Sequence, residues 1–95
     1  MTFELFQTSL ADAELPVELS PYLSALWHEA VGDWDKAHQI VQDIETVEAS
    51  AIHAYLHRKE GDESNARYWY GRAGRPFPAG KTFDEEWNAL VNELL

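Results

Sequence analysis

The sequence predicts an all-α fold made of two helical hairpins that lie between two capping helices. Three observations predict it: apolar residues recur at spacings of three and four, proline and glycine punctuate these stretches, and part of the chain is repeated. Spacings of three and four place side chains on one face of an α-helix. The chain has 95 residues, of which 45% are hydrophobic, so a single domain is expected.

The N-terminal capping helix is predicted over residues 3–13. Phe3, Phe6 and Leu10 follow one another at spacings of three and four, which suits one face of a short helix. Pro16 ends this segment, because proline cannot continue a helix. The helix is expected to cover one end of the hairpins, since stacked hairpins expose apolar surface at both ends.

The first hairpin is predicted over residues 20–45. Ser20 followed by Pro21 gives an N-cap and a first-turn proline, the strongest helix-start pair in the chain. Gly32 and Asp33 then interrupt the helix, because glycine adopts a positive φ readily and aspartate is a good N-cap. A second helix is expected to begin directly after this pair.

The second hairpin is predicted over residues 47–74 and has the same organisation. Thr46 is a suitable N-cap for its first helix. Gly61 and Asp62 repeat the Gly-Asp interruption, and Gly74 supplies a C-terminal stop. Both hairpins are therefore predicted from the same kinds of residue.

The C-terminal capping helix is predicted over residues 83–95. Residues 75–80 include two prolines and are expected to form an ordered loop. Thr82 and Glu85 then have the spacing of a capping box. The apolar stripe of this helix is expected to cover the hairpins, and homodimerisation or partner binding is the alternative use. The stripe consists of Phe83, Trp87, Leu90, Val91 and Leu94.

The two hairpins align with each other at an offset of 29 residues. Each copy has a helix, a Gly-Asp turn and a second helix, with a small residue near the middle of each helix where two backbones can approach closely. The identical pairs are Ala25 and Ala54, His28 and His57, Gly32 and Gly61, Asp33 and Asp62, and Ala37 and Ala66.

The second copy resembles the tetratricopeptide repeat (TPR). The residues that carry the resemblance are Ala54, Gly61, Asp62, Ala66, Tyr70, Ala73 and Pro78. The period of 29 residues is shorter than the family's repeat of about 34, and two copies are present rather than three or more. The resemblance implies a right-handed stack of TPR-like hairpins, in which the first helix of each hairpin lines a concave groove. The segments WHEAVGDWDKAH and HAYLHRKEGDESNARYWYGRAGRPFP also look like a family of small bacterial proteins of unassigned function.

The charge and composition of the chain argue against several classes of function. A net charge of −10 disfavours nucleic-acid binding, because neutralising phosphates requires an excess of Lys and Arg. The absence of cysteine excludes disulfides, thiolate metal sites and a cysteine nucleophile. No signal peptide or membrane-spanning apolar run is found, so a cytoplasmic location is expected. No cofactor or catalytic motif is predicted, and the acidic pairs lie at helix starts, where the helix dipole accounts for them.

Positive charge is concentrated in residues 58–81. This stretch contains six of the seven basic residues and three acids, so its net charge is +3, whereas that of the remaining chain is −13. A basic and aromatic surface here would suit an acidic peptide or a carboxylate. The alternative is that these cations pair with acids of the same chain, such as those at 84–86. The candidate partner-binding residues are Tyr55, Arg58, Lys59, Tyr68, Arg72 and Arg75.

The histidines offer a metal site as an alternative function. His53 and His57 are four residues apart, the spacing at which two side chains of one helix can hold the same ion. His28 is the repeat equivalent of His57 and is the candidate third ligand. The favoured interpretation predicts no metal ligand: His28 and His57 pack between helices with one nitrogen hydrogen-bonded, while His38 and His53 are exposed. The glutamates near enough in sequence to add an oxygen ligand are Glu29 and Glu60.

Together these patterns predict a protein- or peptide-interaction module with an acidic partner, and they predict neither a nucleic-acid nor a membrane partner. Two other classes of function are alternatives. One is a small-molecule or metal-binding protein, or a minor enzyme, that uses the histidines. The other is a homodimer formed through the C-terminal helix.

Overall fold

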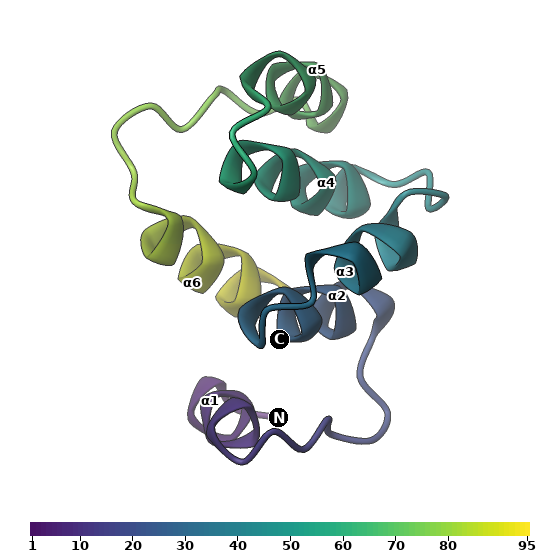
Figure 1. The fold of residues 1–95 in the computed structure, drawn as a ribbon, viewed down its shortest axis with the longest axis vertical. Helices are drawn as coiled ribbons and strands as arrows, with labels where there is room; N and C mark the ends of the chain where they lie inside the picture. Colours follow the sequence, from purple (N-terminus) through teal and green to yellow (C-terminus); the bar gives the residue numbers. More distant parts are fainter.

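The computed structural model describes all 95 residues and consists of six α-helices without a β-strand, which confirms the predicted all-α fold (Figure 1). None of the helices is both long enough and apolar enough to span a membrane. The helices are α1 (Phe3–Ala11), α2 (Pro21–Ala30), α3 (Trp34–Val41), α4 (Val47–Lys59), α5 (Glu63–Ala73) and α6 (Phe83–Leu94).

The helices begin at the capping residues that the sequence predicts. The side chains of Ser20 and Thr46 each accept a hydrogen bond from a backbone N–H three residues further along. Thr82 and Glu85 form the complete capping box, with both reciprocal bonds present. These bonds satisfy backbone N–H groups that have no partner inside the helix.

The two Gly-Asp turns have nearly the same backbone geometry. Gly32 has a φ of +92° and Gly61 a φ of +88°, a region that disfavours side chains with a Cβ atom. Asp33 and Asp62, which follow them, are the N-caps of α3 and α5. The Gly-Asp pair that occurs twice in the sequence therefore forms the same turn twice in the structure.

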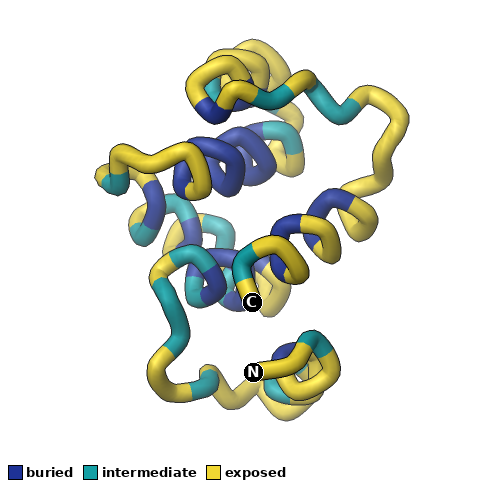
Figure 2. Tube along the Cα trace, turned by 180° about the vertical axis from the view of Figure 1, so that it is seen from behind, coloured by how far each residue is buried: buried dark blue, intermediate teal, exposed yellow.

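Helix α4 lies at the centre of the molecule. It packs mainly on α5 and also contacts α2, α3 and α6, whereas α2 packs mainly on α3 (Figure 1). Its residues from Ala49 to His57 are all buried, which Figure 2 shows as a continuous dark segment. A helix that is buried on every side can bring residues from several neighbours together. The TPR-like, right-handed arrangement of the hairpins stays a prediction.

Two apolar clusters lie against α4. The larger one contains buried residues from all six helices, including Ala73 of α5, and the smaller one joins α4 and α5. The ring of Phe77, in the loop before α6, meets the ring of Tyr70 edge-on at 5.6 Å, as expected for an ordered loop. The fully buried members of the larger cluster include Phe6, Leu26, Ile52, Leu56 and Val91.

Helix α6 packs against α2 and α4, one helix of each hairpin. The indole N–H of Trp87 donates to the backbone oxygen of Leu26 at 3.1 Å, and its ring meets the ring of Phe6 edge-on. Leu90 and Val91 are buried in the larger cluster. Most of the predicted apolar stripe therefore packs within its own chain, and the homodimer stays a prediction.

Candidate functional site

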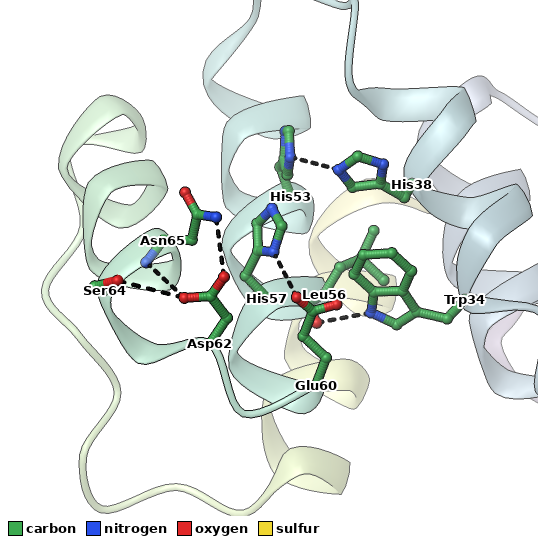
Figure 3. A network of polar contacts seen from close by, with 9 residues as sticks. All are labelled: Trp34, His38, His53, Leu56, His57, Glu60, Asp62, Ser64 and Asn65. Carbon is green, nitrogen blue, oxygen red and sulfur yellow. Dashed lines mark hydrogen bonds and ion pairs between the residues drawn. The ribbon is translucent and has the colours of Figure 1, made fainter.

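Three histidines from two helices converge beside the centre of the molecule. His53 and His57 lie one turn apart on α4, and His38 comes from α3 (Figure 3). One ring nitrogen of each histidine lies within 4.8 Å of one from each of the other two. The Nε2 atoms of His38 and His53 are 3.0 Å apart, so one of them donates a hydrogen bond to the other.

Two tryptophans enclose this cluster. The indole of Trp34 stacks on His38 with ring centroids 4.9 Å apart, and that of Trp69 stacks on His53 at 4.0 Å. Trp34 is itself anchored, because its N–H donates to the backbone oxygen of Leu56 at 2.8 Å. The imidazoles are therefore held between aromatic walls contributed by α3 and α5.

Burial keeps two of the three imidazoles neutral. Desolvation, followed by the nearby His38 and His57, lowers the pKa of His53 from 6.5 to about 4. The pKa of His38 is also lowered, mainly by desolvation and next by His57. A neutral imidazole has a free nitrogen lone pair, which is the form that binds a metal ion.

The ring of His57 has a hydrogen-bond partner outside the cluster. Its Nδ1 atom lies 3.3 Å from a carboxylate oxygen of Glu60, which follows α4 directly. Because an ionised carboxylate only accepts hydrogen bonds, Nδ1 is the protonated nitrogen. In the neutral ring the lone pair is then on Nε2, the nitrogen left for the cluster.

The cluster differs in one residue from the histidines of the metal-binding alternative, which are His28, His53 and His57. His28 is not a member: its Nδ1 donates to the backbone oxygen of Ser24 at 2.8 Å, and its ring lies against Trp27. His38 takes its place, and the expectation that His38 and His53 are exposed is wrong, since only 5% of His53 is accessible and His38 is partly buried. The expectation that His28 and His57 each have one hydrogen-bonded nitrogen is confirmed.

Three of the predicted partner-binding residues surround two buried glutamates. Lys59 pairs with Glu29 at 2.5 Å, and the hydroxyl of Tyr55 lies 3.4 Å from the same carboxylate. Arg58 pairs with Glu86 at 2.8 Å. Both glutamates are more than nine-tenths buried, so Lys59 and Arg58 balance charges inside the molecule, while the hydroxyl of Tyr55 donates a hydrogen bond to Glu29.

The other three partner-binding candidates differ from one another in their partners. Arg75 forms a two-bond ion pair with Glu93. Arg72 has no carboxylate partner; it donates to the hydroxyl of Tyr68 and lies over the ring of Trp69. Tyr68 is 54% exposed. An aromatic and basic edge thus remains on the surface at Tyr68 and Arg72, whereas internal pairing accounts for Arg75.

The groove implied by the TPR resemblance is only partly open. Tyr55 and Lys59 line a cavity of about 330 Å³ together with Glu29 and Asp84. The lining thus contains two acids and a single lysine, so the cavity has no excess of positive charge. Helix α6 packs against both α2 and α4 beside it. The cavity therefore lacks the charge expected of a binding site for an acidic peptide.

Comparison with known proteins leaves the function to be inferred from this geometry. No family model, no curated protein and no solved structure matches the chain.

Proposed function

We propose that the protein binds a divalent transition-metal ion through the imidazole rings of His38, His53 and His57. The observation that carries this proposal is the convergence of three histidine nitrogens within 4.8 Å of one another. Imidazole suits Zn²⁺, Cu²⁺ and Ni²⁺, whereas Mg²⁺ and Ca²⁺ prefer oxygen ligands. The expected ion is therefore Zn²⁺ or another late transition metal.

The separation of the nitrogens supports a shared ion. Two nitrogens that each lie about 2.0 Å from a tetrahedral ion are about 3.3 Å apart. The Nε2 atoms of His38 and His53 are 3.0 Å apart, so a small outward movement would admit the ion between them. The proton between these two nitrogens would move to an Nδ1 atom, because both Nε2 lone pairs are needed.

The number of ligands indicates what kind of metal site this is. Structural zinc sites generally have four protein ligands, whereas catalytic zinc sites have three and keep a fourth position for water or substrate. Three histidines supply three ligands. A water molecule or another small ligand is therefore expected to complete the coordination, and the geometry assigns no particular reaction to it.

Metal titration with matched histidine variants tests the proposal. Calorimetry of the metal-stripped protein with Zn²⁺ is expected to give one binding site, which His53→Ala removes. His28→Ala is the control, because His28 is the repeat equivalent of His57 but lies outside the cluster. Absence of stoichiometric binding, or an equal loss in both variants, would defeat the proposal.

A second candidate function is the binding of an acidic protein or peptide at the edge formed by Tyr68 and Arg72. Its support is that Arg72 has no carboxylate partner and that Tyr68 is more than half exposed. Arg72→Glu is expected to release partners that the wild-type protein retains on a column. Arg67→Glu, on the same helix, is the control, and unchanged partners in Arg72→Glu would rule this edge out.

A further inference from the structure

The carboxylate of Glu60 occupies an unusual position for an acidic residue. Glu60 is the C-cap of α4, where the unpaired backbone oxygens give the helix end a partial negative charge. A carboxylate is unfavourable there, and the repeat-equivalent residue in the first hairpin is Val31. Helix capping therefore does not explain the side chain of Glu60.

The contact with His57 does explain it. The side chain of Glu60 hydrogen-bonds to Nδ1 of His57 and to no other group. The nearby carboxylate of Asp62 is already engaged as the N-cap of α5, where it accepts bonds from Asn65 and Ser64. Glu60 is thus the acidic residue whose carboxylate is free to hold the imidazole (Figure 3).

His28 shows the orientation that a histidine adopts at the equivalent place without such a carboxylate. Its Nδ1–H bonds to the backbone oxygen four residues earlier, that of Ser24. The corresponding backbone oxygen for His57 belongs to His53. His57 instead turns toward Glu60 and stacks on the ring of His53, with centroids 4.8 Å apart.

We infer that Glu60 is the positioning residue of the metal site, because it holds His57 in the orientation that directs Nε2 toward His38 and His53. The inference rests on the proposed metal binding. Carboxylates that hold a ligating histidine by its second nitrogen fix the orientation of the ring and raise its basicity. Their loss typically weakens metal binding by about 10–100-fold.

Two variants of Glu60 separate orientation from charge. Glu60→Ala removes the acceptor and is expected to weaken Zn²⁺ binding by about 10–100-fold. Glu60→Gln keeps an acceptor oxygen without the charge and is expected to restore most of the affinity. Glu63→Ala is the control, because Glu63 is a nearby exposed acid that pairs with Arg67. The visible absorption spectrum of the Co²⁺-saturated protein is expected to be the same in all of them, since the three ligands are unchanged.

Wild-type affinity in Glu60→Ala would overturn the inference, as would a Glu60→Gln variant as weak as Glu60→Ala. A measurement without metal distinguishes this failure from failure of the metal site itself. Proton–proton contacts between the rings of His53 and His57, measured by NMR, are expected in the wild-type protein and in Glu60→Gln but not in Glu60→Ala. Their persistence in Glu60→Ala would overturn the role of Glu60 even if the wild-type protein bound no Zn²⁺.

Discussion

The α2–α3 and α4–α5 hairpins have the same Gly-Asp turn but differ in the side chains that face neighbouring helices. His28 and His57 are equivalent in the repeat, yet the first bonds to a backbone oxygen and the second to Glu60. The residue one turn before them is Ser24 in α2 and His53 in α4. The same helical framework therefore gives an isolated histidine in one copy and a cluster in the other.

The second helices of the hairpins diverge in the same way. Trp34 and His38 of α3 form an aromatic stack next to α4. Their repeat equivalents in α5 are Glu63 and Arg67, which form a solvent-exposed ion pair. Helix α3 has a hairpin beside it, whereas no hairpin follows α5. Equivalent positions of the two hairpins therefore carry different side chains where different elements pack against them.

The largest loss of stability is expected for the buried ion pairs, in which the two hairpins contribute opposite charges. Glu29 and Arg58 occupy equivalent positions of α2 and α4, and Arg58 neutralises Glu86. Arg58→Ala would leave the Glu86 carboxylate buried and should cost about 3–5 kcal/mol of unfolding free energy. Urea denaturation measures this cost. A loss no larger than that of a surface pair would mean that water reaches Glu86.

The two hairpins should also contribute differently to the pH dependence of stability. The pKa of His53 is about 4 in the folded protein and 6.5 in the unfolded one, so the unfolded state takes up the proton first as the pH falls. Stability is then complete above pH 6.5 and declines toward pH 4, by up to about 1.4 kcal/mol per pH unit.

Urea denaturation of metal-free protein at several pH values checks this dependence. His53→Gln is expected to flatten the decline, although His38 keeps part of it because its pKa is lowered as well. His28→Gln, in the other hairpin, is expected to leave the decline unchanged. Equal slopes for the wild-type protein and His53→Gln would contradict the assignment.

The two turn glycines should behave alike. A Cβ atom added at Gly32 or Gly61 meets nothing within 4 Å, so the cost of substitution comes from the positive φ alone. Each alanine variant is expected to lose about 1–2 kcal/mol. Gly71→Ala, inside α5, is the control and should gain about 0.5–1 kcal/mol. Clearly unequal losses at Gly32 and Gly61 would break the equivalence of the two turns.

The smallest effect is expected at the exposed pair of α5. Arg67 and Glu63 are both more than half exposed, and Arg67 also lies over the ring of Phe77 at 4.1 Å, so Arg67→Ala should cost about 1 kcal/mol or less of unfolding free energy. His38→Ala, at the equivalent position of α3, should cost more because it opens the aromatic stack. Thermal denaturation of the two variants side by side checks this order.

The helices could be predicted from the sequence because their signals are local. Ser20, Thr46 and Thr82 act on backbone groups only three residues away, and the structure has each of these caps. The proximity of His53 and His57 could be predicted for the same reason, because both lie on one helix four residues apart. These features depend on spacing along one helix and need no knowledge of its neighbours.

The third histidine and most of the ion-pair partners could not be predicted with the same rules, although the alternative that basic residues pair with the acids at 84–86 is confirmed for Arg58 and Glu86. The contact of His38 with His53 joins α3 to α4, and the pairing of Lys59 with Glu29 joins α4 to α2. One signal was nevertheless present for His38: with Trp34, Ala37 and Val41 it has the i, i+3, i+4, i+7 spacing of a buried helix face. That pattern argued against an exposed His38 without identifying its partner.

The two tryptophans that stack on the histidine cluster should show by their fluorescence whether a metal ion is bound there. Trp34 and Trp69 stack directly on His38 and His53, so a paramagnetic ion such as Cu²⁺ held by those rings should quench their fluorescence. The other two tryptophans, Trp27 and Trp87, are hydrogen-bonded away from the cluster, to Ser9 and to the backbone of Leu26. The emission of these two tryptophans would serve as an internal reference. The fraction of metal sites occupied could then be measured without an added label.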